Sequence, residues 1–233
     1  CAHEYYHAVQ FAYDVGENVW FMEAAATWME DYVYDPVNDN YNYCSDWFSN
    51  PDWSLHSTTD LHLYAAFIWP VYLVQNFGAA IMPDIWDELI STSPYPAFTT
   101  VLAAHSTTLN PNYARFAAWN FITNTRNDGL HFEEAVRYPL ISLVRTHNTY
   151  PVVGQLPIAS KYPDAMGSNY VLFNIPGDAN SITVTFNGDN TTPWIVTMMP
   201  WKSSPSDIYA ESTMVLNGSG DGTFTLYSAN SWS

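Results

Sequence analysis

Charged residues are scarce in this sequence, and basic ones are very scarce. Lysine, arginine, aspartate and glutamate make up 12% of the 233 residues, and 23 acidic residues against 6 basic ones give a net charge of -17. This excess of negative charge disfavours binding to nucleic acids and to anionic membrane surfaces, because their phosphate groups would repel it. We therefore expect no nucleic-acid partner. Asn, Thr, Ser and Tyr must supply the polar surface, which favours a secreted or cell-surface protein.

Long hydrophobic runs and cysteines are also few. No apolar run approaches about 18 residues, so the sequence predicts no transmembrane segment. Hydrophobic residues still make up 48% of the chain, which is enough for a folded core. The only cysteines are Cys1 and Cys44. A disulfide between them would close a loop of about 40 residues and stabilise the fold by about 3–4 kcal/mol. Two free buried thiols are the alternative, and the sequence leaves both open.

The chain changes character near residue 150. Before it, apolar residues recur at spacings of three and four, which predicts helices at 2–13, 19–34, 61–77, 81–90, 112–123 and 132–144. We expect Asp60 to cap the third helix, Gly78 to end it and Pro70 to kink it. After it, short segments such as SITVTFNG and GTFTLYSA are separated by turn sequences such as NGDN, which predicts strands. The fold class is therefore α+β, with a mainly helical domain at 1–150 and a small antiparallel β-sandwich at 151–233.

The stretch HEYYH at residues 3–7 is the first candidate for chemistry. On a helix, His3 and His7 lie one turn apart on the same face, so both imidazoles can reach one metal ion. Glu4 lies about 100° further round the helix, where it can touch a metal-bound water without binding the metal. This is the HExxH arrangement of two zinc ligands and a general base. Because only three positions are fixed, two unrelated histidines on a helix are the alternative.

A third protein ligand decides the class of such a site. A metzincin requires glycine at position 10 and histidine at position 13, where this chain has Gln10 and Tyr13. A gluzincin takes a glutamate from a following helix instead. Glu23 lies in the apolar run WFMEAAA, where an unpaired carboxylate would be costly to bury. Glu30, two turns further on, competes with it. The DVGEN stretch allows a tight turn that would bring the two helices side by side.

Several separated blocks of the sequence resemble a family of secreted bacterial metallopeptidases of the gluzincin type. The blocks are HEYYHAVQFAYD, WFMEAAATWMEDYVYDPVNDNY, FIWPVYLVQNFG, IMPDIWDEL and FAAWNFITNTR, and together they cover most of the chain. The resemblance implies that His3, His7 and Glu23 bind zinc, that Glu4 is the general base, and that Glu30 and Asp31 orient a ligand histidine. It also implies a β-sandwich after the catalytic helices. It implies no particular substrate.

Three further expectations concern the surroundings of this site. A gluzincin needs a donor for the negative charge that develops on the scissile carbonyl oxygen, and Tyr64 is our first choice, followed by His62. In zincins a sheet precedes the HExxH helix, and no segment before Cys1 could form it here. We therefore expect this sequence to be a fragment of a longer chain, with an upstream segment that is disordered, cleaved or supplied elsewhere as the alternative. The acid-rich stretch DPVNDNYNYCSD suggests calcium ligands at Asp35, Asp39 and Asp46, although it lacks the EF-hand spacing and a polar loop is the alternative.

The sequence thus leads to two hypotheses of different classes. The first is a secreted zinc metallopeptidase that hydrolyses a peptide or protein substrate. The second is an extracellular structural, adhesive or filament-forming protein that self-assembles and is built on a truncated or inactive peptidase scaffold. The presence of His3, Glu4, His7 and Glu23 together favours the first hypothesis. A protein that had lost the activity would be expected to have lost at least one of these four residues.

Overall fold

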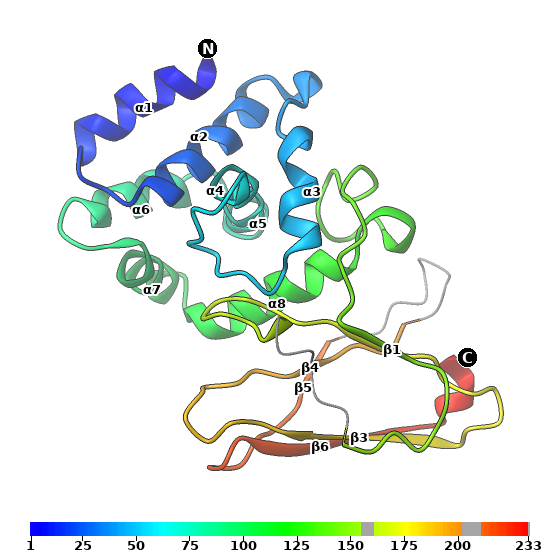
Figure 1. Ribbon diagram of the computed structural model, residues 1–233. Coiled ribbons are helices and arrows are strands. Elements are labelled where there is room, and N and C mark those ends of the chain that lie inside the picture. The colour runs from blue at the N-terminus through cyan, green and yellow to red at the C-terminus, as the bar shows by residue number, and fades with distance from the viewer. Residues whose placement is uncertain (155–160, 202–210, 233) are drawn as a thin grey trace.

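The computed structural model describes residues 1–154, 161–201 and 211–232. Helices form the first half of the chain and short strands follow, so the α+β class predicted from the sequence is confirmed (Figure 1). The helices are α1 (Ala2–Tyr13), α2 (Val19–Val33), α3 (Tyr41–Ser49), α4 (His62–Ala65), α5 (Ile68–Phe77), α6 (Ile81–Leu89), α7 (Pro94–Ala104) and α8 (Leu109–Phe121), with 3-10 turns η1 (Asp35–Val37), η2 (Asn124–Arg126) and η5 (Ala229–Trp232). Within the described residues, none of these helices is long and apolar enough to cross a membrane.

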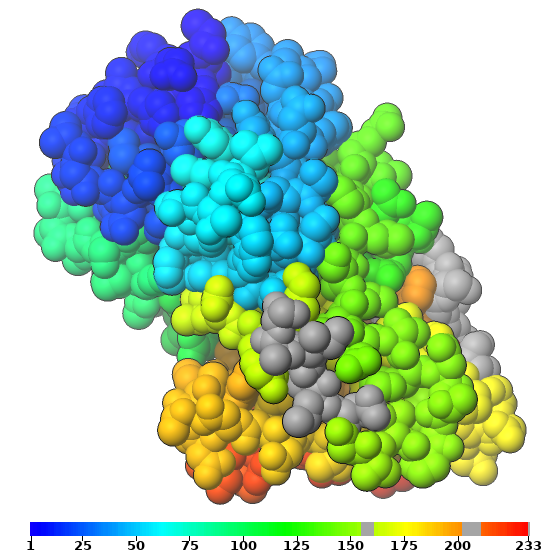
Figure 2. Space-filling view, viewed as in Figure 1, coloured from blue at the N-terminus to red at the C-terminus, as the bar shows by residue number. Residues whose placement is uncertain are grey.

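The first two helices form an antiparallel hairpin, as the sequence predicts. The turn between them is short, and the Gly16 amide stabilises it by donating to Asp14 Oδ1 at 2.8 Å. Across the hairpin, the ring of Tyr6 packs edge-on against that of Trp28, with centroids 6.3 Å apart. Both helices lie at one end of the molecule and the strands lie at the other, as Figures 1 and 2 show.

The core lies among α2, α5, α7 and α8, and it is dominated by aromatic rings. α2 contributes the consecutive alanines 24–26, which are fully buried, favour the helix and allow its neighbours to approach closely. Trp69 of α5 is also fully buried; its ring stacks on Tyr72 and meets Phe116 of α8 edge-on at 5.1 Å. Because burial of such large rings contributes most of the hydrophobic stabilisation, α2 is held firmly at the centre of the helical part.

The predicted helix at 61–77 is divided in two, although not at Pro70. The break falls between α4 and α5, and Pro70 lies in the first turn of α5, where its missing N–H costs nothing. Asp60 does not cap the first piece, because it has a left-handed backbone with φ of 51° and α4 begins after Leu61. Gly78 ends α5 with φ of 87°, as predicted.

Other local predictions are wrong. Segment 132–144 is not a helix but a series of turns and extended backbone. Its apolar residues at spacings of three, Phe132, Ala135, Tyr138 and Ile141, are buried all the same, so the pattern indicated burial rather than helical structure. Helices α3 and α7 were not predicted. α3 begins within the acid-rich stretch that was interpreted as a possible calcium or polar loop, and α7 contains two prolines and three β-branched residues, which lower helix propensity.

The strands pair in twos. They are β1 (Arg145–His147), β2 (Val171–Phe173), β3 (Ser181–Asn187), β4 (Thr197–Met198), β5 (Ser212–Thr213) and β6 (Asp221–Tyr227). β3 pairs antiparallel with β6, and β4 with β5, as the predicted antiparallel arrangement requires. β1 pairs with β2 in parallel, which the sequence did not predict and which the long connection between them permits. The alternation expected in β3 is confirmed, with half-buried Ile182, Val184 and Phe186 between exposed neighbours.

The two cysteines are not joined in this structure. Cys1 is an exposed free thiol at the start of α1, whereas Cys44 is a buried free thiol in α3. Burial raises the pKa of the Cys44 thiol to about 12, and the nearby Glu134 and Asp31 carboxylates add to this. Cys44 therefore remains protonated at neutral pH and acts as a small core residue. The structure therefore has free thiols, but only Cys44 is buried as that alternative expected.

Candidate metal centre

The helical hairpin brings His3, His7 and Glu23 together. One ligand atom from each lies within 4.8 Å of the others. His3 Nε2 is 2.9 Å from Glu23 Oε2, and His7 Nε2 is 3.6 Å from the same oxygen. The three side chains are only 15–18% exposed, so water screens their interaction weakly. The i, i+4 spacing on α1 and the position of Glu23 one turn into α2 therefore converge on one point.

The outer nitrogen of each histidine is held by a second residue. His3 Nδ1 lies 2.6 Å from Glu30 Oε1, and a carboxylate can only accept, so this nitrogen donates. His7 Nδ1 lies 2.7 Å from Gln10 Oε1, while Gln10 Nε2 donates to the Met22 carbonyl at 2.9 Å. The Met22 carbonyl fixes which end of the Gln10 amide faces His7. Both histidines consequently turn Nε2 towards Glu23.

Gln10 is a member of this candidate site that the sequence did not predict. It is fully buried and links the two helices, but the sequence analysis used it only to exclude a metzincin. Its spacing of three from His7 on one helix is a signal that could have identified it, since residues at i and i+3 are neighbours on a helix surface. The predicted role of Glu30 matches its position, because its carboxylate reaches His3.

The donor set and its spacing fit a zinc ion. Zinc binds histidine nitrogens and carboxylate oxygens at about 2.0–2.2 Å, so ligand atoms around a tetrahedral ion are about 3.3 Å apart. The observed separations of 2.9 and 3.6 Å lie on either side of that value. Two histidines and a glutamate leave a fourth position open for water or substrate, as in catalytic zinc sites. The same three groups could otherwise form an ion pair with a protonated histidine.

Glu4 and Tyr64 border this group. Glu4 follows His3 on α1 and is exposed to solvent. The ring of Tyr64, from α4, lies 6.2 Å from that of His3. Burial raises the pKa of Tyr64, and the charges of Glu23 and Glu4 raise it further, so the hydroxyl is a protonated donor at neutral pH. Tyr43 of α3 stacks on Tyr64 at 5.1 Å and was not predicted, because α3 itself was not.

Two other predicted residues lie elsewhere. His62 is fully buried, stacks on Trp47, and has its Nδ1 3.0 Å from Asp46 Oδ1. Burial lowers its pKa against the opposing effect of Asp46, and it therefore serves the core rather than the site. Asp31 does not orient either histidine, because its carboxylate lies with those of Asp35 and Glu134. One of its oxygens, Oδ1, has no hydrogen-bond partner among the described residues.

The calcium ligands predicted from the acid-rich stretch do not come together. Asp46 is engaged by His62, and only Asp35 joins an acidic group, whose other members are Asp31 and Glu134. Burial raises the pKa of Asp31 to about 7, and the charges of Glu134, Asp35 and Glu133 add to the effect.

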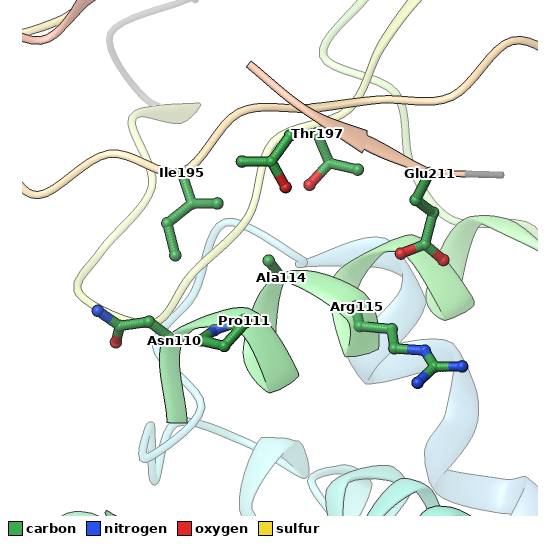
Figure 3. Close-up of a pocket in the computed structure, with 8 residues that line it drawn as sticks. Asn110, Pro111, Ala114, Arg115, Ile195, Thr197 and Glu211 are labelled. Atoms are coloured by element: carbon green, nitrogen blue, oxygen red, sulfur yellow. The ribbon is translucent and has the colours of Figure 1, made fainter. Parts of the chain in front are cut away.

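A hollow of about 290 Å³ lies where α8 meets the strands (Figure 3). Asn110, Pro111, Ala114 and Arg115 of α8 line one wall, and Thr197 and Glu211 line the other. Burial raises the pKa of the Glu211 carboxyl, while Arg115 and His131 oppose the shift. The hollow is on the side of the helical part that faces the strands, far from α1, and the residues lining it include no histidine or cysteine. We assign it no role in chemistry.

Comparison with known proteins places the chain in one family. Residues 1–203 match DUF6055, a family of unknown function, and the chain therefore belongs to that family. The match includes the helical hairpin and extends through β4. No curated protein and no solved structure matches the chain. The gluzincin resemblance therefore stays a prediction.

Proposed function

We propose that this protein is a secreted zinc metallopeptidase whose metal ligands are His3, His7 and Glu23. The observation that carries the proposal is the paired orientation of the two histidines. Each has Nδ1 hydrogen-bonded, to Glu30 or to Gln10, and each directs Nε2 at Glu23. Ligand histidines in metal sites are almost always held in this way by a second group. Two unrelated histidines on a helix would not be expected to share this arrangement.

The residues around the ion divide the work of peptide hydrolysis. Zinc, when bound, supplies a Lewis acid and makes a water acidic enough to act as a nucleophile near neutral pH. Glu4 accepts the proton of the attacking water and passes it to the leaving amine as the C–O bond forms and the C–N bond breaks. Tyr64 donates its O–H to the negative charge that develops on the carbonyl oxygen. His3, His7 and Glu23 would hold the zinc ion.

The proposal is tested by metal content and proteolysis together. We expect elemental analysis of the purified protein to find one zinc per chain. We also expect it to hydrolyse an unstructured protein such as casein, with loss of activity on treatment with a zinc chelator and recovery on adding zinc. A protein that contains no zinc and forms ordered polymers in particle-size measurements would contradict the proposal and favour the structural alternative. Absence from the medium when the natural host is grown would contradict secretion.

Replacing Glu30 is expected to weaken zinc binding without removing a ligand. Glu30→Gln replaces the carboxylate that accepts from His3 Nδ1, so that His3 becomes less basic and less well oriented. We expect zinc affinity to fall by about 10–100-fold, measured by competition with a chromogenic chelator. Glu88→Gln on α6 is the matched control and should leave affinity unchanged. Equal affinity in Glu30→Gln and wild type would show that the carboxylate does not act through His3.

Removing the Tyr64 hydroxyl is expected to slow catalysis and spare zinc binding. In Tyr64→Phe we expect kcat to fall by about 10²–10³-fold, the usual cost of losing one donor to a developing oxyanion. Zinc content should stay at wild-type level. Tyr43→Phe is the control, because it keeps the stacked ring next to Tyr64; its kcat should change little. If both variants lose activity equally, the effect comes from packing and Tyr64 is not the donor.

A further inference from the structure

A second group of carboxylates gathers at the far end of α2. Asp31 from α2, Asp35 from η1 and Glu134 from the segment after α8 each place an oxygen within 4.8 Å of the other two. None of the ion pairs formed by the described residues includes any of the three. Three acidic groups at this distance repel one another when ionised. A cluster of carboxylates alone does not define a binding site. The side chains around this one indicate whether it could bind a cation.

Asn40 is a buried polar side chain that lacks partners at this position. It is 1% exposed, and neither Oδ1 nor Nδ2 makes a hydrogen bond of acceptable geometry with any described residue. Its amide nevertheless lies against the Asp31 carboxyl, close enough to lower the pKa of that group. The buried Oδ1 atoms of Asp31 and Asn38 are also unpaired. Burying unsatisfied polar atoms is costly, so a cation bound by these oxygens would offset that cost.

Glu134 is held in place by tyrosines. Tyr41 donates its hydroxyl to Oε1 at 2.5 Å, and Tyr138 donates to Oε2 at 3.4 Å. Both oxygens keep lone pairs for another ligand, because each carboxylate oxygen can accept more than once. Tyr138 is fully buried, so the carboxylate is fixed from the core side. Its orientation is therefore set before any ion arrives.

We propose that Asp31, Asp35, Glu134 and the side-chain oxygen of Asn40 form a calcium site. Calcium prefers six to eight oxygen ligands at about 2.3–2.6 Å, so oxygens on opposite sides of the ion are about 5 Å apart. The three carboxylate oxygens lie close enough together to bind one such ion, and water completes the shell. Zinc prefers nitrogen and sulfur ligands, which this group does not offer. Magnesium requires a tighter octahedron at about 2.0–2.1 Å.

This site would link three parts of the chain. Calcium would join the end of α2 to η1 and to the segment after α8, neutralising the charges that repel one another there. α2 also carries Glu23 and Glu30, so the ion would fix the helix that supplies the zinc ligand and the carboxylate bonded to His3. The proposal does not depend on the zinc chemistry, since the two groups share no residue.

Calorimetric titration of the purified full chain with calcium chloride tests the proposal. We expect one calcium per chain, binding at least about 100-fold more weakly in Asp31→Asn and in Asp35→Asn, because each loses one charged ligand. Asp35 is exposed, so Asp35→Asn should fold normally. Asp87→Asn, an exposed aspartate on α6, is the matched control and should bind as wild type does. Calcium should raise the Tm of wild type and of the control, but not of the two variants.

The relative stability with and without calcium gives a second readout. In calcium-free buffer, Asp31→Asn removes one of the repelling charges and should be at least as stable as wild type; with calcium, wild type should be the more stable. Three results would overturn the proposal. They are no calcium binding by the folded wild type, calcium binding unchanged in both variants, and tighter binding of magnesium or zinc than of calcium at these residues.

Discussion

The Glu4→Gln variant is expected to lose peptide hydrolysis while keeping its zinc. The substitution preserves the size of the side chain but removes its ability to take a proton from the attacking water. General-base catalysis contributes about 10²–10⁴-fold, and we expect kcat to fall by that factor. Glu4 is exposed on α1, so neither folding nor the geometry of His3 and His7 should change. The measurement is kcat on a fluorogenic peptide, with zinc content determined on the same sample.

The control for this experiment is Glu88→Gln, which alters a glutamate on α6 and should retain full activity. A wild-type rate in Glu4→Gln would exclude Glu4 as the base. If the variant also loses its zinc, the carboxylate acts through the metal ligands, and the role proposed for it is wrong.

The Glu23→Gln variant is expected to lose zinc. Glu23 Oε2 is the atom on which both histidines converge, and an uncharged amide is a poor zinc ligand. We expect the affinity for zinc to fall by more than the about 10–100-fold predicted for an orienting residue such as Glu30. Elemental analysis should find one zinc per chain in wild type and far less in the variant. Circular dichroism should show the same helix content in both, because the neighbouring alanines and aromatic residues hold α2 in the core.

Glu88→Gln again serves as the control and should retain one zinc per chain. If Glu23→Gln also retains it, the third ligand is another residue and the His3–Glu23 contact is a simple ion pair. A comparison with Glu30→Gln separates ligand from orienting residue: losing Glu23 must cost more zinc affinity than losing Glu30.

The grouping of the candidate metal ligands could be predicted in outline because its pattern is local. His3, Glu4 and His7 lie within five residues, and a helix is enough to place them. Glu23 and Glu30 required only one more inference, that the DVGEN turn folds α2 back along α1. The same reasoning could have predicted the contact of Gln10 with His7, since the two residues are three apart on one helix. Its buried position between the helices, where it meets the Met22 carbonyl, depends on packing that a single helix pattern does not show.

The acidic group at the other end of α2 could not be predicted, because Glu134 is distant in sequence from Asp31 and Asp35. The position of Glu134 depends on the backbone of segment 132–144, for which the apolar spacing wrongly predicted a helix. The residues buried there are those that a helix would have buried, but the backbone follows turns instead. Asp31 was assigned to the candidate zinc site because the family resemblance implied a role for it beside Glu30, although consecutive residues on a helix point about 100° apart.

The strand region was predicted where alternation was strong and missed where it was weak. β3 shows a period of two, and its antiparallel register with β6 runs from Ser181 opposite Tyr227 to Asn187 opposite Asp221. β1 has only three residues, and its parallel pairing with β2 depends on how the connection between them returns. A local sequence pattern does not show how the chain between β1 and β2 is routed.

The most direct test of the central claim is a crystal structure of the zinc-loaded protein with anomalous diffraction measured on both sides of the zinc absorption edge. We predict one strong anomalous peak in contact with His3 Nε2, His7 Nε2 and a Glu23 carboxylate oxygen, with His3 Nδ1 still bonded to Glu30 and His7 Nδ1 to Gln10. A map without a peak at this position, in which His3 Nε2 donates directly to Glu23, would contradict the account.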